Sequence, residues 1–345
     1  MLLFVDGFEH YGTDETNMLA GLWAAFSVTP ELSTTFARTG TYSLWLKGRT
    51  GSPEQTCRFA LGSTNITVGV GYGIYCPNLP SSNALFYTKL ASAAAADILS
   101  VIVQSDGSIC VRKGDETGAV VDISDAVITA GTFHHIEFKT VFDTVAGAVE
   151  VRVNGVTVLM IGGLNLGAVG AASVIFTNDL PTGIGYYIDD VFAWNDVGSY
   201  NNDFLGAQRV LTVYPAADTA QADFTKNGAG TGIGCINQVA PDGDTTYLGS
   251  AVVGDKSEFT LPTLPPELVT IAGVFVPVMG KLDAAGIGNI KPSMKSVAAV
   301  LAGTDSPLTT GYSYVKSVFE YDPNTSVAWT KAGFEAAKLR LEKSL

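Results

Sequence analysis

Polar and apolar side chains alternate with a period of two residues along much of the chain. Val149, Val151 and Val153 illustrate the pattern, with polar or charged residues between them. Because successive side chains of a β-strand point to opposite faces, this alternation predicts strands that bury one face. Asp-Gly at 106–107 and Asn-Gly at 154–155 lie between such segments and predict tight hairpin turns. The chain is therefore predicted to be nearly all-β.

The composition fits short buried strands joined by many turns. Of the 345 residues, 47% are hydrophobic, 15% are charged and 38 are glycine. This mixture excludes a disordered chain, which would need low hydrophobicity and high charge. Helical segments are few: residues 87–98, with an alanine-rich run, predict a short helix or a loop excursion, and residues 330–337 predict a short helix. The alternating segment 338–342 predicts a closing strand.

The length and one composition shift predict two domains. Residues 195–203 are polar and rich in asparagine and glycine, and they follow a completed strand pattern. A second series of strands begins after them. We therefore predict two antiparallel β-sandwich (jelly-roll) domains, one over 1–198 and one over 208–345, joined by a linker over 199–207.

Charge and hydropathy argue against two classes of partner. The net charge is −13, and the 20 lysines and arginines are scattered. Nucleic-acid binding needs a cationic surface that displaces counterions, so no nucleic-acid partner is expected. No run of about 20 apolar residues is present, so no membrane insertion is expected. The first residues carry no basic region and too short an apolar run for a secretory signal.

The four cysteines predict no metal site. Cys57, Cys76, Cys110 and Cys235 are widely spaced and have no histidine at ligand spacing. They are expected to be reduced, small apolar residues, which favours synthesis in a reducing cytosol. A Cys57–Cys76 disulfide remains open, since spacing does not determine pairing.

The hairpin block resembles the concanavalin A-like lectin/glucanase superfamily in its laminin-G-like form. That resemblance covers about residues 1–198 and implies a concanavalin A-like first domain. It rests on a histidine-containing strand, a strand with an Asn-Gly turn, an Asp-Asp closing strand and an opening strand. These segments are Phe133–Phe138, Val149–Leu159, Ile188–Phe192 and Val5–Glu9.

The remainder of the chain is similar to a family of bacteriophage and prophage virion proteins. In that family a lectin-like domain precedes a second β-domain. The similar segments are Asn202–Gly206, Arg209–Pro215, Pro241–Tyr247, Val253–Lys256 and Phe319–Pro323 with Trp329–Thr330. The resemblance implies a virion location after assembly in the host cytoplasm, with other virion proteins as partners. It does not fix a position among tail, fibre, collar and capsid surface.

Candidate chemistry is sparse. Glucanases of this fold carry acidic residues at alternate positions of one strand, and no such run is present. His134 and His135 are adjacent and are expected to face opposite sides of a strand, so they cannot act together. No catalytic residue and no cofactor are therefore predicted, and the chain is expected not to be an enzyme. Asp189, Asp190, Asp242 and Asp244 are weak calcium candidates, because Ca²⁺ prefers several oxygen ligands.

Glycines and tyrosines in the predicted strands leave alternatives open. Gly69, Gly71 and Gly73 alternate, which permits close packing or aromatic cover on one face of a strand. The tyrosines of these strands fit core or interface positions, or stacking on sugars. They are Tyr72, Tyr75, Tyr186 and Tyr187.

The sequence thus predicts a virion structural protein that acts through protein–protein interfaces, as a tail-associated part or a capsid decoration. A homo-oligomer, with a trimer favoured, is expected from the symmetry of such particles. The alternative is a carbohydrate-binding module for host-surface adsorption, with a surface glycan as partner. The ligand-binding residues are left open.

Overall fold

The computed structural model describes residues 1–345 except 14, 20, 26–30, 49–54, 82–84 and 180–184. The chain forms two compact units, Met1–Leu211 and Thr212–Leu345. Sequence analysis placed the domain limits at residues 198 and 208. That the two parts fold independently stays a prediction. Each unit is described by itself below.

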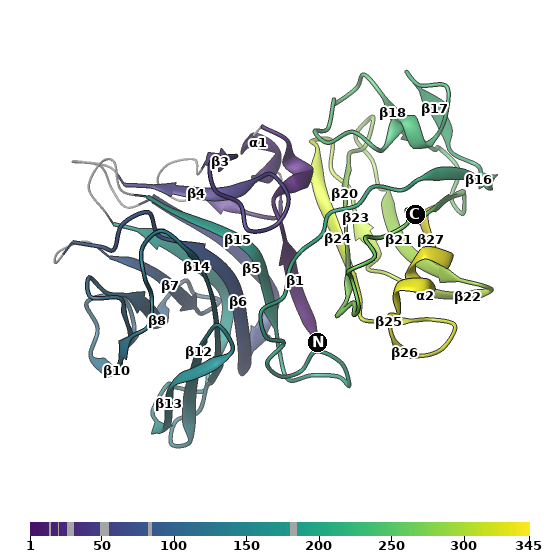
Figure 1. Ribbon diagram of the computed structural model, residues 1–345. Coiled ribbons are helices and arrows are strands. Elements are labelled where there is room, and N and C mark those ends of the chain that lie inside the picture. The colour runs from purple at the N-terminus through teal and green to yellow at the C-terminus, as the bar shows by residue number, and fades with distance from the viewer. Residues whose placement is uncertain (14, 20, 26–30, 49–54, 82–84, 180–184) are drawn as a thin grey trace. The chain divides into compact units, whose positions relative to one another are not determined.

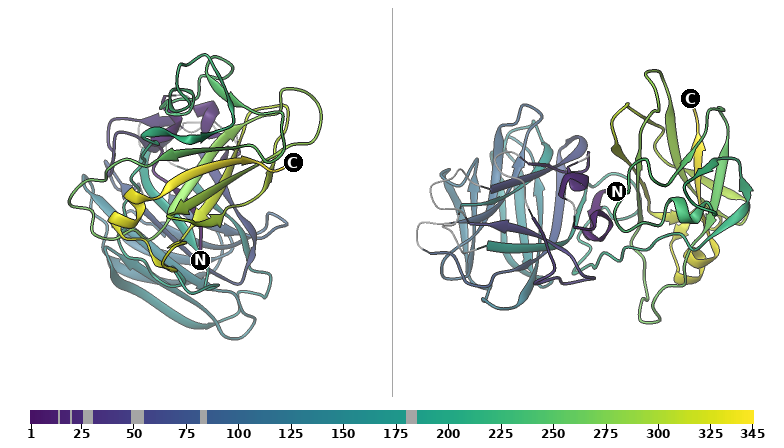
Figure 2. Two further views of the ribbon diagram at one scale, coloured as in Figure 1. Left: turned by 90° about the vertical axis from the view of Figure 1, so that its right-hand side faces the viewer. Right: turned by 90° about the horizontal axis from the view of Figure 1, so that it is seen from above.

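Unit 1 contains two antiparallel sheets, which Figure 1 shows as separate layers and Figure 2 shows from two further sides. Sheet A has the order β13-β12-β11-β6-β15-β4-β3, with β1 paired to β15. Its strands are β1 (Leu2–Asp6), β3 (Glu31–Ser33), β4 (Ser43–Lys47), β6 (Thr67–Tyr75), β11 (Phe133–Val141), β12 (Gly147–Val153), β13 (Val156–Leu164) and β15 (Gly185–Trp194).

Sheet B has the order β10-β9-β8-β7-β14-β5-β2. Its strands are β2 (Ala24–Ala25), β5 (Gln55–Asn65), β7 (Phe86–Ala91), β8 (Asp97–Val103), β9 (Ser108–Lys113), β10 (Val120–Ala126) and β14 (Ala171–Asn178). Two short helical segments, η1 (Glu9–Tyr11) and α1 (Glu15–Met18), follow β1.

The core of unit 1 lies between the inner faces of the two sheets. Tyr72 of sheet A meets Phe176 of sheet B edge-on, with ring centroids 5.0 Å apart. The Tyr72 hydroxyl also accepts a hydrogen bond from Thr88 Oγ1 at 2.8 Å, so its polar end is satisfied inside the core. Phe86 of sheet B packs on Tyr186 of sheet A at 4.7 Å. The alternation predicted strands that bury one face, and a second sheet packed against that face provides the burial.

Unit 2 contains one larger antiparallel sheet and three two-stranded ladders. The sheet has the order β16-β19-β27-β21-β22, with β23 paired to β21. Its strands are β16 (Ala217–Ala222), β19 (Lys256–Thr260), β21 (Asn289–Ser296), β22 (Ala299–Ala302), β23 (Ser306–Pro307) and β27 (Lys338–Lys343). The ladders pair β17 (Thr225–Asn227) with β18 (Tyr247–Gly249), β20 (Val274–Gly280) with β24 (Ser313–Phe319), and β25 (Tyr321–Asp322) with β26 (Val327–Ala328). The helical segments are η2 (Ile233–Cys235) and α2 (Lys331–Ala336).

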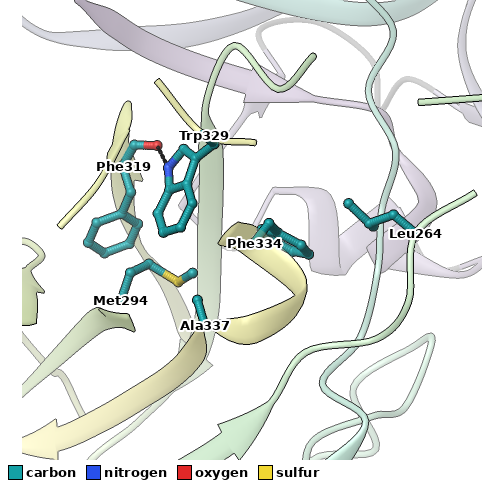
Figure 3. Close-up of a cluster of buried hydrophobic side chains, with 6 residues drawn as sticks. All are labelled: Leu264, Met294, Phe319, Trp329, Phe334 and Ala337. Carbon is teal, nitrogen blue, oxygen red and sulfur yellow. Dashed lines mark hydrogen bonds between the residues drawn. The ribbon is translucent and has the colours of Figure 1, made fainter. Parts of the chain in front are cut away.

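Two apolar clusters form the core of unit 2. In the first, shown in Figure 3, the Trp329 indole N–H donates to the Phe319 carbonyl at 3.0 Å. This bond satisfies the polar atom of a ring that is otherwise buried. The members of this first cluster are Leu264, Met294, Phe319, Trp329, Phe334 and Ala337. In the second, Phe259 and Leu341 of the sheet pack with Val276 of β20, so the β20–β24 ladder covers one face of the sheet.

The predicted all-β class is confirmed, and unit 1 is built from two antiparallel sheets as a sandwich requires. The predicted helix at 330–337 and the closing strand at 338–342 are also confirmed, as α2 and β27. The predicted helix over 87–98 is wrong, and the alternative of a loop holds only for residues 92–96. There β7 and β8 form a hairpin in which Leu90 lies opposite Leu99, both fully buried, and the alanine-rich run connects the two strands.

The four cysteines are free and buried, as expected, and Cys57 and Cys76 form no disulfide. Among the described residues, no helix is long and apolar enough to cross a membrane.

Aromatic rings cover the alternating glycines of β6. A Cβ atom on Gly69 would lie 1.9 Å from the Trp194 ring, and one on Gly71 would lie 2.1 Å from the Phe192 ring. Both rings belong to β15, which pairs with β6. The glycines therefore leave room for rings that lie flat against the backbone of the neighbouring strand.

We predict that Gly71→Ala destabilises unit 1 by about 1–3 kcal/mol, because the added methyl group overlaps the Phe192 ring. Gly162→Ala in β13 is the matched control, since a Cβ there meets no atom within 4 Å. Chemical denaturation of wild type and both variants measures the difference. Equal stability of the Gly71 and Gly162 variants would contradict this account of the glycine positions.

Candidate functional site

Four aromatic residues form one row across the outer face of sheet A. Trp45 of β4 pairs with Tyr187 of β15, Tyr187 pairs with Tyr75 of β6, and Tyr75 pairs with Phe133 of β11. The row is thus perpendicular to the strands and spans about 14 Å at the usual strand spacing. We call these four residues the aromatic row.

The rings of the row contact one another from strand to strand. The Trp45 and Tyr187 rings are nearly parallel, at 3°, with centroids 5.6 Å apart. Tyr187 and Tyr75 meet edge-on at 6.1 Å, and Tyr75 and Phe133 are 5.3 Å apart. Trp45, Tyr75 and Phe133 are each partly exposed. Together the four rings form a continuous apolar surface on the outer face of sheet A.

Charged side chains flank the Trp45 end of the row. The Lys47 ammonium lies 4.4 Å from the centroid of the Trp45 ring and forms an ion pair with Glu31. Glu31 is also the cross-strand partner of Trp45 on β3. One cation and one anion therefore neutralise each other beside the ring, and both remain partly exposed as polar groups.

A fifth ring lies on top of the aromatic row. Phe36 belongs to residues 34–42, which connect β3 to β4 and which we call the 34–42 loop. The Phe36 ring stacks on Tyr75 at 4.1 Å and 19°, and it meets Tyr187 edge-on at 5.0 Å. Tyr187 is consequently only 6% exposed.

Three buried or half-buried carboxylates hold the 34–42 loop. Asp189 accepts hydrogen bonds from the backbone N–H groups of Arg38 and Thr39, at 2.7 and 3.0 Å. Asp190 accepts from the Arg38 guanidinium at 2.7 Å and from the Thr39 hydroxyl at 3.0 Å. Glu9 accepts from two further backbone N–H groups, those of residues 41 and 42. These bonds place the loop beside the row.

Asp189 and Asp190 face the same loop, whereas strict alternation would have turned them to opposite sides. The register of β15 shifts between Asp189 and Phe192, and Asp190 has a φ of 51°. This bulge turns both carboxylates toward Arg38. Burial and the negative charge of Asp190 raise the pKa of Asp189 to about 7, and burial raises the pKa of Asp190.

Residues 203–210 lie along the same face of sheet A. Glu137 accepts hydrogen bonds from the Leu205 and Gly206 backbone N–H groups and from the Trp194 indole N–H. Phe204 meets Trp194 edge-on at 5.9 Å. Part of the segment predicted as a linker is therefore held on sheet A within unit 1.

The two adjacent histidines lie on opposite faces of β11 and do not act together. His134 Nε2 accepts from the Thr129 backbone N–H at 3.1 Å. His135 stacks on Phe192 at 5.8 Å and 17°, and neither of its ring nitrogens has a partner in the described part of the chain. Burial, and then the positive charge of Arg38, lower the pKa of His135 to about 3.

The calcium candidates are occupied by protein contacts. Asp242 accepts from the Thr246 backbone and hydroxyl, and Asp244 pairs with Lys281 and with the Tyr312 hydroxyl. Where the chain is described, no group of three or more histidine, cysteine, aspartate or glutamate side chains could hold a metal ion. Calcium binding at Asp189, Asp190, Asp242 or Asp244 stays a prediction.

The structure separates the four tyrosines that sequence analysis proposed for sugar stacking. Tyr72 and Tyr186 are 1% and 0% exposed and point into the core, while Tyr75 and Tyr187 belong to the aromatic row. Sequence analysis missed Trp45, Phe133 and Phe36. Alternation gave a signal for Trp45, which lies between the core residues Leu44 and Leu46, but none for Phe36, which lies outside a strand.

Similarity to known proteins is found among solved structures. No protein-family model and no curated protein sequence matches the chain. Solved structures with a similar fold include the cellulose-induced protein Cip1, at 18% identity and a TM-score of 0.42, covering 55% of this chain and 96% of that one. The potassium-bound carbohydrate recognition domain of Emp46p matches at 9% identity and a TM-score of 0.37, covering 55% and 98%.

The alginate lyase Aly36B is also similar, at 14% identity and a TM-score of 0.38, covering 56% of this chain and 96% of that one. At these identities the similarity shows the fold alone. The neighbours are sandwiches of the galectin-like and concanavalin A-like type, and nothing in them bears on a phage origin.

The expectation that the chain is not an enzyme is corrected by this comparison, because enzymes share the fold. That expectation rested on the lack of a carboxylate run, which concerns hydrolysis of glycosidic bonds. A lyase instead eliminates across a carbon–carbon bond and needs a base for a carbon-bound proton. The missing carboxylates therefore do not exclude catalysis.

We predict that His135 makes unit 1 less stable as the pH falls. The folded state keeps the imidazole neutral down to about pH 3, whereas the unfolded chain takes up a proton near pH 6.5. The stability contribution of the neutral ring is thus present above pH 6.5 and is lost as the pH falls toward 3. When the pH is lowered from 7 to 5, the free energy of unfolding should fall by about 2 kcal/mol more in the wild type than in the His135→Phe variant.

Asp189 titrates with the opposite sign in the same range. Its raised pKa favours the folded state at low pH, and this contribution is lost as the pH rises through about 7. Both proteins retain Asp189, so the difference between their denaturation curves at each pH isolates His135. Parallel pH profiles for wild type and variant would exclude the proposed role of the buried imidazole.

Proposed function

We propose that unit 1 is a carbohydrate-binding module whose ligand lies along the aromatic row. The observation that carries this proposal is the in-register placement of Trp45, Tyr187, Tyr75 and Phe133 on four neighbouring strands. One face of a pyranose ring presents C–H groups and its edge carries hydroxyl groups. An aromatic surface with a few polar groups beside it suits such a ligand.

The dimensions of the row favour a linear oligosaccharide over a single sugar. Neighbouring strands lie about 4.8 Å apart, which is close to the length of one pyranose unit in an extended chain. A glycan that crosses the strands would therefore place about one sugar over each strand of the row. The balanced pair of Lys47 and Glu31 beside Trp45 offers hydrogen-bonding groups without a net charge, which favours a neutral glycan.

A place on a phage particle remains a proposal supported only by the resemblance of the sequence to virion proteins. A glycan-binding domain on a virion would serve adsorption to a host surface, which joins the two functions. The virion location, the protein partners and the trimeric state stay predictions.

We predict that Trp45→Ala weakens glycan binding about tenfold or more, because it removes the largest ring of the row. The 345-residue protein is screened on an array of linear neutral and acidic oligosaccharides, and each hit is measured by calorimetry. Tyr247→Ala is the matched control, since this tyrosine is 40% exposed and lies in unit 2. It should bind like wild type.

Thermal unfolding of the Trp45 variant separates lost binding from lost folding, and Phe133→Ala provides a second variant at the far end of the row. Product analysis after incubation with each hit separates binding from turnover. A Trp45 variant that binds normally would refute the proposal, and so would a lack of glycan binding by both the wild type and a variant in which the covering Phe36 ring is removed.

A further inference from the structure

Phe36 occupies a different layer from the rings of the aromatic row. The four rings of the row project from paired strands, whereas Phe36 comes from the 34–42 loop and lies flat on Tyr75, 4.1 Å away. A planar group stacked at this distance over a ring of a binding face is in the position that a bound sugar ring would take. Phe36 therefore covers the surface on which the ligand is proposed to stack.

The same part of the chain covers the centre of the row. Tyr187 lies on the outer face of sheet A but is only 6% exposed. Its hydroxyl group hydrogen-bonds to Ser33 and Thr35, and its ring meets Phe36 edge-on. Trp45 and Phe133, at the two ends of the row, stay partly exposed. Access is thus reduced at the middle of the row and retained at its ends.

The carboxylate anchors of the loop lie beyond Phe36 in the sequence. The carboxylates of Glu9, Asp189 and Asp190 hold residues 38–42. Phe36 itself is held by its ring contacts and by a hydrogen bond from Ser43 Oγ to its carbonyl, at 2.5 Å. None of these carboxylate bonds involves residue 36, so displacement of the ring from the row does not require any of them to break.

From these contacts we infer that Phe36 is an intramolecular substitute for a sugar ring, which covers the aromatic row until a glycan displaces it. This inference rests on the proposed function. A face that is open in only part of the molecules binds with an affinity reduced by that fraction. Phe36 thus weakens glycan binding, although it is an aromatic residue at the binding face.

The test compares Phe36→Ala with wild type on the same oligosaccharide array and by calorimetry on each hit. Loss of one stacked pair predicts binding about threefold to tenfold tighter in the variant. Phe204→Ala is the matched control, because Phe204 also lies outside a strand and packs on a ring of the same face, that of Trp194. It should leave the affinity unchanged. Phe36→Leu, which keeps an apolar side chain without the ring, covers the case in which the alanine variant fails to fold, and should also bind tighter.

Each result decides between the two proposals. Tighter binding by the Phe36 variants, or binding by them alone, supports the covering role. Weaker or unchanged binding by these variants, with wild-type binding that depends on Trp45, overturns the covering role and makes Phe36 part of the binding surface. If neither wild type nor the variants bind any glycan, the proposed function itself fails.

Discussion

Strand β15 pairs with β6 on one side and with β4 and β1 on the other, so its register decides which side chains reach each face of sheet A. Tyr186 and Ile188 enter the core, and Tyr187 between them is left for the outer face. The bulge after Asp189 then changes the phase, so that Phe192 and Trp194 lie over the glycines of β6. A one-residue slip would exchange the two faces of this strand.

The polar part of the same face depends on that bulge. A buried carboxylate is costly unless hydrogen bonds satisfy it, and a second one beside it adds repulsion. Asp189 and Asp190 offset this cost with N–H donors of the 34–42 loop and with the Arg38 guanidinium. Glu137 does the same with the backbone of residues 205 and 206. Two segments without regular structure are thereby fixed on sheet A by charges that the fold cannot leave unpaired.

Local patterns predicted the strands but could not predict the row. Alternation is visible within each strand, so that Trp45 is separated from Leu44 and Leu46 by sequence alone. The row requires in addition that positions 45, 187, 75 and 133 be opposite one another, and strand order and register are set by contacts between distant segments. The orientation of Asp190 could not be predicted either, because a positive φ at an aspartate produces no recognisable pattern in the sequence. For the alanine-rich run at 91–96, composition left a helix and a loop open, and the pairing of the flanking strands decides for the loop.

The contacts that hold the 34–42 loop and those that hold the Phe36 ring differ in kind. The loop is attached through carboxylates, and its attachment depends on protonation and on the Arg38 charge. The Phe36 ring is attached mainly by stacking on Tyr75 and by an edge-on contact with Tyr187, and both contacts are largely indifferent to pH. A ligand that replaces the ring covers the same part of Tyr75 and Tyr187, whereas the displaced Phe36 ring loses these contacts. The free energy of binding then depends on what the ligand adds beyond that stack, through contacts with Trp45, Phe133 and the polar groups beside them. The ends of the row would accordingly determine the specificity among glycans. The Phe36 ring over its centre would lower the affinity for all of them.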